Sequence, residues 1–258
     1  KKLERLVGLD KRRDEAHYYL GRIAEQEERI EDALMHYMQV NPGRDFINAT
    51  RRLGSILLRA QRQQDHSDYF MQLRQRFPQF KAQLYAVEVE SLDNYGLFAA
   101  TAMTLNQALV ELPNNTSLQY MRSMTLEKLG DLQGMEADLR SILEREPANA
   151  TGLNALGYTL ANKTDRYEEA EILIEQALAL EPNEPAILDS YGWVKYRLGD
   201  HQGAVKYLQL AYNAFPDPEV AAHLGEVLWV AGDTEAALKI WATALSRNPS
   251  HKVLLETM

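Results

Sequence analysis

The sequence predicts an all-α fold, a right-handed superhelix built from about seven stacked helix–turn–helix repeats. The first observation is a set of prolines spaced 33 to 35 residues apart: Pro78, Pro113, Pro147, Pro182, Pro216 and Pro249. Because proline lacks an N–H and clashes with the preceding helical turn, each is expected just after the second helix of a repeat. A period near 34 residues is typical of arrays of helical hairpins. No alternating run with hairpin turns is present, so we expect no sheet.

The second observation is a set of small residues that keep the same period. Glycine returns midway along the first helix of five units, at Gly21, Gly54, Gly157, Gly192 and Gly225. Glycine costs roughly 1 kcal/mol inside a helix, so its return predicts a close helix–helix contact that a Cβ would block. Large apolar residues fill the matching place on the second helices: Tyr37, Phe70, Leu105, Leu139, Ile174, Leu208 and Trp241.

The third observation is a repeated Gly-Asp pair between paired helices, at 130–131, 199–200 and 232–233. Glycine suits the left-handed end of one helix, and aspartate favours the positive end of the next helix dipole. These pairs therefore predict the tight turn inside each hairpin.

The whole pattern resembles the tetratricopeptide repeat (TPR) family over nearly the entire chain. The expected units are 14–46, 47–81, 82–115, 116–149, 150–184, 185–217 and 218–251. The third and fourth units depart from the pattern, with Val89 and Ser123 in place of glycine, and the second has His66 where alanine is usual. We interpret residues 1–13 as the end of a preceding repeat and residues 252–258 as the start of a C-terminal helix. Neither end looks like a polar cap, so we expect a piece of a longer solenoid.

The charge is uneven along the chain, whose formal net charge is −9. Residues 82–258 carry twelve Lys/Arg against twenty-five Asp/Glu, which argues against nucleic-acid binding and suits a basic protein partner. Residues 44–81 carry eight Lys/Arg against three Asp. This basic segment either binds an acidic partner or pairs with its acidic neighbours, and we favour the second interpretation because charged helix faces usually pair locally.

Patterns that would indicate catalysis are missing from the sequence. We find no Gly-rich phosphate loop, no HExxH and no EF-hand loop, and there are no cysteines. Glu168, Glu169 and Glu171 cluster at the start of a second helix, where acidic residues favour the helix dipole. We therefore expect a protein that is not an enzyme and that has no catalytic residue, cofactor or metal site.

The first helices of stacked hairpins line a concave groove, which we expect to bind protein. The candidate groove residues are Tyr120, Met124, Asn154, Tyr158, Asp189, Trp193, Tyr196, Arg197, His223, Glu226 and Trp229, with Tyr18 and Arg22 in the first unit. Trp, Tyr and Arg dominate interface energetics. We assign Trp241 to the core and expect Trp193 to be exposed in the groove. For Tyr158, Tyr196 and Trp229, packing between repeats stays equally open.

Two stretches carry a closer resemblance: GYTLANKTDRYEEA at 157–170 and ILDSYGWVKYRLGD at 187–200. They resemble the LbcA-like family of proteobacterial outer-membrane TPR lipoproteins, the adaptors of carboxyl-terminal processing proteases. The resemblance implies an adaptor that faces the periplasm, with a lipid anchor upstream of Lys1. It also implies two protein partners, the processing protease and the peptidoglycan hydrolases presented to it.

Two other functions fit the same repeats. TPR lipoproteins also assist type IV pilus assembly and exopolysaccharide export, so an assembly factor without a protease partner is the main alternative. A cytosolic regulator is the third.

Overall fold

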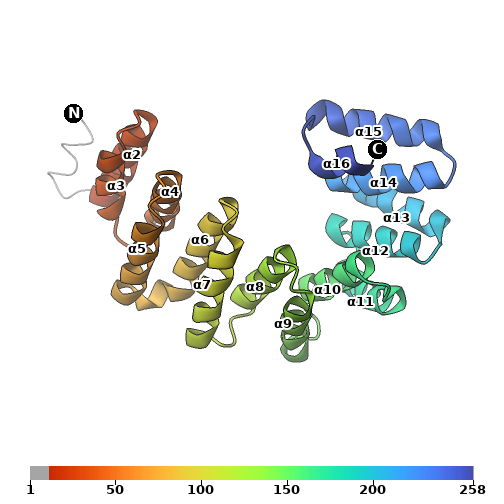
Figure 1. Cartoon of the computed structure of the whole chain (residues 1–258), viewed down its shortest axis with the longest axis horizontal. Helices are drawn as coiled ribbons and strands as arrows, with labels where there is room; N and C mark the ends of the chain where they lie inside the picture. Colours follow the sequence, from red (N-terminus) through yellow and green to blue (C-terminus); the bar gives the residue numbers. More distant parts are fainter. Residues whose placement is uncertain (1–11, 258) are drawn as a thin grey trace. The chain divides into compact units, whose positions relative to one another are not determined.

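The computed structural model describes residues 12–257, and every regular element in that range is helical (Figure 1). In chain order the elements are α2 (Arg13–Gln26), α3 (Ile30–Met38), α4 (Phe46–Arg59), α5 (Gln63–Arg76), the short 3₁₀ helix η1 (Pro78–Phe80), α6 (Lys81–Asn94), α7 (Phe98–Glu111), α8 (Thr116–Lys128), α9 (Leu132–Arg145), α10 (Ala150–Lys163), α11 (Tyr167–Leu180), α12 (Pro185–Arg197), α13 (His201–Ala214), α14 (Pro218–Val230), α15 (Thr234–Arg247) and α16 (Lys252–Thr257). Within this range no helix is both long enough and apolar enough to cross a membrane. The predicted all-α solenoid of helical hairpins is confirmed.

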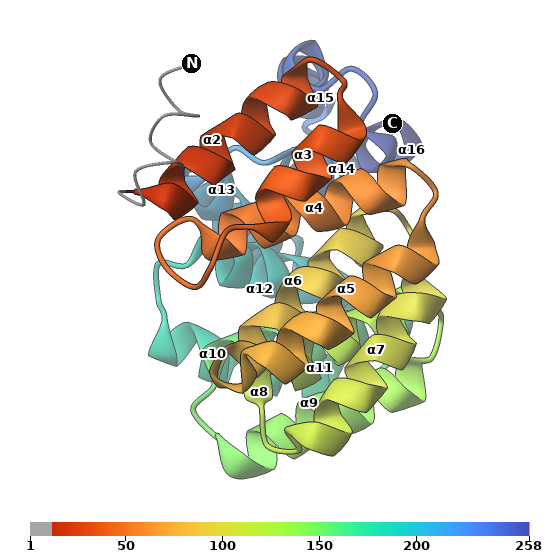
Figure 2. The same cartoon turned by 90° about the vertical axis from the view of Figure 1, so that its left-hand side faces the viewer.

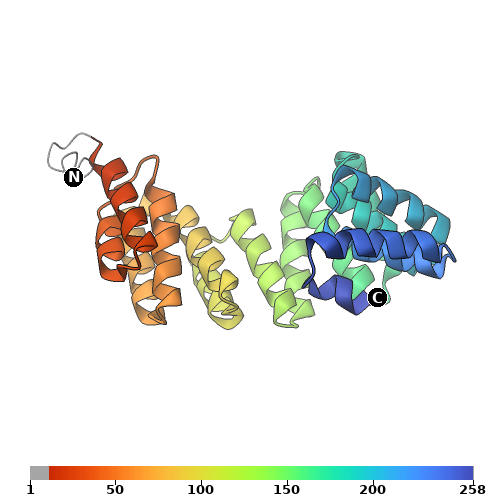
Figure 3. The same ribbon diagram turned by 90° about the horizontal axis from the view of Figure 1, so that it is seen from above.

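The chain divides into two compact units, Lys1–Met135 and Glu136–Met258. In unit 1, α2 packs on α3, α3 on α4 and α4 on α5, which places the first two hairpins side by side (Figure 2). In unit 2, the pairs α10/α11, α12/α13 and α14/α15 are the main hairpins. The short α16 packs on α14 and α15 at the end of the chain (Figure 3). The bounds of the individual repeats stay a prediction.

The periodic prolines end the second helices as expected. Helices α5, α7, α9, α11, α13 and α15 each stop two residues before one of the six prolines. The turns inside the hairpins also follow the prediction, since Gly199 and Gly232 have φ of 85° and 94° at the ends of α12 and α14. Asp200 and Asp233 then cap the next helices by accepting hydrogen bonds from Gly203 N and Ala236 N.

The helix-A glycines lie against the large apolar residues of the second helices. A Cβ on Gly157 would lie 2.6 Å from Cγ1 of Ile174 and 2.9 Å from the carbonyl oxygen of Ala170. A Cβ on Gly192 would lie 2.6 Å from Cγ of Leu208. All seven large apolar residues named from the sequence are at most 3% exposed, Trp241 included. The close contact within the hairpins that carry a helix-A glycine and the core assignment of Trp241 are therefore confirmed.

Buried polar groups join α5 to α6, the first helix of the next hairpin. His66 is 1% exposed, and its Nε2 lies 2.7 Å from Oγ of Ser91. Burial, with a smaller effect of the Arg74 charge, lowers the pKa of His66 to about 4. Arg74 forms a buried ion pair with Glu88, and its guanidinium lies 3.9 Å from the ring centroid of Tyr85. Hydrogen bonds thus join these two helices where Gly and Ala are missing.

The C-terminal helix begins at Lys252, within the segment expected to start a helix. Leu254 is fully buried in the same core cluster as Leu224 and Trp241, whereas Leu255 is 54% exposed. This short helix is enough to seat Leu254 in the core, because successive helix positions point in different directions. The end of a preceding repeat, expected over residues 1–13, lies almost entirely outside the described residues.

Candidate protein-binding surface

Three first helices of unit 2 bring six candidate residues together. Asp189, Trp193 and Tyr196 lie on one face of α12, because residues three and four apart share a helix face. Tyr158 comes from α10, and His223 and Glu226 come from α14. We call these six residues the aromatic–acid cluster.

Contacts across the helices hold this cluster. Nδ1 of His223 lies 3.0 Å from both carboxylate oxygens of Asp189. The Trp193 ring stacks on the His223 ring, with centroids 4.3 Å apart and planes at 26°. The centroid of the Tyr158 ring, from α10, lies 6.2 Å from that of the His223 ring. The hydroxyl of Tyr196 donates to Oε1 of Glu226 at 3.1 Å. The cluster therefore couples three successive repeats.

The expectation that Trp193 is exposed in the groove is wrong. Trp193 is only 7% exposed, because the rings of His223 and Tyr196 cover it. Its Nε1 is buried and has no hydrogen-bond partner among the described residues. Asp189 and His223, also predicted groove residues, are each 8% exposed. Their side chains join α12 to α14, so they support the surface from beneath.

The side chains that solvent reaches on this surface are fewer than the predicted groove residues. Trp229 is 48% exposed, and its ring lies 6.0 Å from that of Trp241. Tyr158, Tyr196 and Glu226 are partly exposed. Trp229 is thus partly exposed to solvent and also lies near Trp241 of the neighbouring helix α15. We call Tyr158, Tyr196, Glu226 and Trp229 the open face of unit 2.

The remaining predicted residues do not join the cluster. Arg197 lies with its guanidinium 4.7 Å from the ring centroid of Tyr167 and donates a hydrogen bond to the Tyr167 hydroxyl. Asn154 is partly exposed on α10, and its buried Oδ1 has no hydrogen-bond partner among the described residues. Tyr120 and Met124 are partly buried on α8, which belongs to unit 1.

The aromatic–acid cluster contains two carboxylates, Asp189 and Glu226, and one basic group, His223. Burial acts to lower the pKa of His223, but the charge and hydrogen bond of Asp189, with Glu219 and Glu226, raise it above its ordinary value. Burial and the nearby Glu226 charge raise the pKa of Tyr196. Residues 136–258 carry ten Lys/Arg against nineteen Asp/Glu. This face therefore suits a basic ligand.

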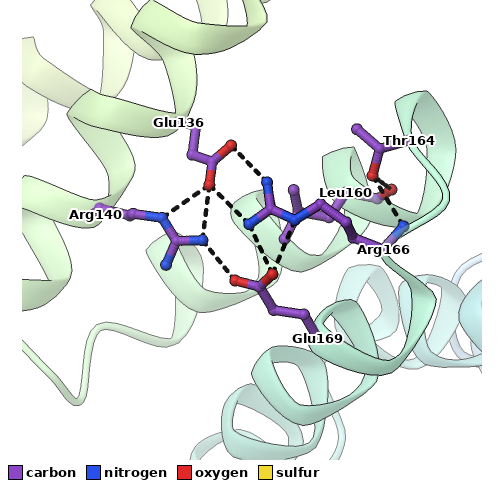
Figure 4. A network of polar contacts seen from close by, with 6 residues as sticks. All are labelled: Glu136, Arg140, Leu160, Thr164, Arg166 and Glu169. Atoms are coloured by element: carbon purple, nitrogen blue, oxygen red, sulfur yellow. Dashed lines mark hydrogen bonds and ion pairs between the residues drawn. The ribbon is translucent and has the colours of Figure 1, made fainter.

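Two of the three glutamates at the start of α11, Glu169 and Glu171, form ion pairs. Arg140 Nη2 donates to Glu169, and Arg166 bridges Glu136 and Glu169 at 2.7 to 3.0 Å (Figure 4). Thr164 Oγ1 donates to the Leu160 carbonyl in the turn between α10 and α11, and Glu171 pairs with Lys195. No group of three or more potential metal ligands occurs within residues 12–257.

Unit 1 contains a polar cleft that the sequence analysis largely missed. Its volume is about 420 Å³, and its lining residues are Tyr18, Glu25, Asn48, Arg51, Arg52 and Ser55. Only Tyr18 was among the candidates. The signal was available, since Tyr18, Arg51 and Asp189 each precede their helix-A glycine by three residues.

Most arginines of the basic segment pair within unit 1. Arg51 pairs with Glu90, Arg52 with Glu25, and Arg62 with Glu31 and Asp65. The buried Arg74–Glu88 pair belongs to the same set. The predicted pairing with acidic neighbours is confirmed.

Solved structures with the same fold have little sequence in common with this chain. A TPR protein from Parabacteroides merdae has a TM-score of 0.66 at 15% identity, covering 95% of this chain and 96% of that one. TTC0263, a thermophilic TPR protein from Thermus thermophilus, has a TM-score of 0.58 at 24% identity, covering 64% and 91%. PilW, a type IV pilus biogenesis factor, has a TM-score of 0.63 at 16% identity, covering 83% and 99%. These likenesses show the fold alone.

One relative and a family profile are much more similar to this chain in sequence. TPR repeat-containing protein PA4667 of Pseudomonas aeruginosa is 46% identical over 213 residues, a match that covers 83% of this chain and 36% of that protein. The chain thus spans about a third of that relative's length. A family profile described as tetratricopeptide repeat matches residues 120–186, 163–219 and 192–252, just over half of the chain. TPR folds are typically non-enzymatic scaffolds for protein interaction, and by this match the chain belongs to the tetratricopeptide repeat family.

Proposed function

We propose that this chain is the protein-binding part of an adaptor that presents basic cell-wall hydrolases to a carboxyl-terminal processing protease. The open face of unit 2 carries this proposal. It combines an exposed indole, two partly exposed tyrosines and a carboxylate in a unit with nearly twice as many acidic as basic residues. Aromatic side chains supply contact area, and the negative field attracts a basic partner.

The identity of the partners rests on the resemblance of residues 157–170 and 187–200 to the LbcA-like lipoproteins. The same resemblance supports a protein that faces the periplasm and is held at the outer membrane by a lipid anchor outside this chain. The 46% identity to PA4667 supports only the coarser part of the proposal, a TPR repeat protein.

Binding between purified proteins tests the proposal. We expect the chain to retain both a purified carboxyl-terminal processing protease and a basic peptidoglycan hydrolase on a biosensor. The double variant Glu226→Gln/Trp229→Ala should weaken hydrolase binding at least tenfold, because it removes the charge and the exposed indole together. The matched control is Glu235→Gln/Leu238→Ala on α15, which changes the same residue classes on the second helix of the same repeat.

Two results would contradict the proposal. The first is no binding of either protein by the unmodified chain. The second is equal weakening by the control variant, which would show that the open face has no special part. Binding of purified type IV pilus or exopolysaccharide-export components in place of the protease would favour the assembly-factor alternative.

A further inference from the structure

The polar cleft of unit 1 lies between the first helices of two neighbouring hairpins. Tyr18 and Glu25 come from α2, and the other lining residues come from α4. All of these residues except Asn48 occupy the same repeat positions as members of the aromatic–acid cluster of unit 2. The cleft is therefore the corresponding first-helix surface of unit 1, and its volume of about 420 Å³ is in the range of ligand sites.

The side chains in and beside the cleft leave an excess of positive charge. Arg51 Nε donates to both carboxylate oxygens of Glu90 at 3.1 and 3.0 Å, and Arg52 Nη1 donates to Glu25 at 3.0 Å. Arg59 also approaches Glu25, at 3.8 Å, which is beyond hydrogen-bond distance.

A fourth guanidinium adds to this excess. Arg22 follows Tyr18 by four residues and precedes Glu25 by three, so it shares their face of α2. It makes no ion pair with any of residues 12–257 that the structure records. In and beside the cleft, Arg22, Arg51, Arg52 and Arg59 thus bring four positive charges against the two carboxylates of Glu25 and Glu90.

We infer that this cleft binds an acidic segment of a partner polypeptide through its side-chain carboxylates. Arginine presents a planar fork that fits a carboxylate. Arg51 already binds one carboxylate within the chain, since its Nε donates to both oxygens of Glu90. Asn48 and Ser55 add uncharged hydrogen-bonding groups for the backbone of such a segment. The overall charge of −9 disfavours a nucleic acid as the occupant.

This inference goes beyond the proposed function, because it assigns a second ligand of opposite charge. The open face of unit 2 is acidic and repels an acidic segment, whereas the cleft of unit 1 attracts it. One chain would thus hold two polypeptides that differ in charge, each in its own unit.

The test uses the whole chain and fluorescein-labelled peptides in an anisotropy titration at low salt. The probes are hexaglutamate, hexaglutamine and hexalysine. We expect hexaglutamate to bind more tightly than hexaglutamine, and Arg22→Gln/Arg51→Gln to weaken hexaglutamate binding at least tenfold. The control Arg29→Gln/Arg62→Gln removes two arginines from turns of the same unit that are paired with acids. It should change binding less than twofold, with circular dichroism checking that each variant is folded.

Three results would overturn the inference: hexaglutamate and hexaglutamine bind equally, the cleft and control variants weaken binding alike, or no peptide binds. Salt-sensitive self-association that is lost in the cleft variant would also overturn it, since the occupant would then be the acidic unit of a second copy. The hexalysine arm keeps the two proposals apart. If the unmodified chain binds hexaglutamate but does not bind hexalysine, the result would count against the proposed function only.

Discussion

At the scale of single residues, the helix-A glycines are constrained by the partner helix. Gly157→Ala should lower the free energy of unfolding by roughly 1–3 kcal/mol, because the new methyl would meet Ile174 and the carbonyl of Ala170. This cost exceeds the gain in helix propensity, which is about 1 kcal/mol. Urea denaturation of both proteins measures the difference.

Gly43→Ala is the control for this substitution. A Cβ at Gly43 would meet nothing closer than the Asn41 carbonyl oxygen at 3.9 Å, so its stability should stay within about 0.5 kcal/mol of the unmodified chain. Equal stability of Gly157→Ala and Gly43→Ala would show that the hairpin has room for a methyl group.

His66 should make the chain sensitive to acid. Burial first, and the Arg74 charge second, lower its pKa in the folded state to about 4 from 6.5. The unfolded chain therefore binds the proton more readily, and the contribution of His66 is complete above pH 6.5 and lost as the pH falls toward 4. The loss amounts to roughly 3 kcal/mol.

The comparison with His66→Ala isolates this contribution. Urea denaturation at a series of pH values should show the unmodified chain losing stability relative to the variant between pH 6.5 and 4. The difference cancels other titrations, including that of Glu88. Parallel curves for the two proteins would mean that His66 does not titrate in this range.

At the scale of helices, the Asp189–His223 pair joins α12 to α14. Asp189 raises the pKa of His223 against the opposing effect of burial, so the pair stabilises the fold most below the unfolded pKa of 6.5. That stabilisation is lost as the pH rises through the folded pKa. Asp189→Asn should therefore cost roughly 1–3 kcal/mol at pH 6, with a smaller cost at pH 9.

Nuclear magnetic resonance gives an independent check on this pair. The titration midpoint of the His223 ring protons should lie above 6.5 in the unmodified chain and should fall in Asp189→Asn. An unchanged midpoint would show that the carboxylate of Asp189 does not set the charge of His223.

At the scale of the whole chain, helical repeats pack mainly on their neighbours, so damage should stay local. We expect Gly157→Ala to reduce hydrogen-exchange protection in α10–α13 and to leave α2–α5 unchanged. Hydrogen exchange read by mass spectrometry resolves these segments. Equal loss of protection in both units would indicate a single cooperative fold.

The helical repeat of this protein can be derived from its sequence. Prolines, Gly-Asp turns and helix-A glycines act through the local backbone and through the contact within one hairpin, so their spacing reports the repeat directly. The local pairing of the basic segment was also predictable, because the first helices of the adjacent repeats carry the acidic residues Glu90 and Glu25.

Which side chains reach a ligand depends on how neighbouring repeats pack. Trp193 and Glu226 each follow a helix-A glycine by one residue, yet Trp193 is 7% exposed and Glu226 is partly exposed. The difference comes from the adjacent repeat, since His223 lies over Trp193. Exposure on a solenoid depends on which side chain of the next repeat covers a position, and that is fixed by packing between repeats that a helical period does not encode.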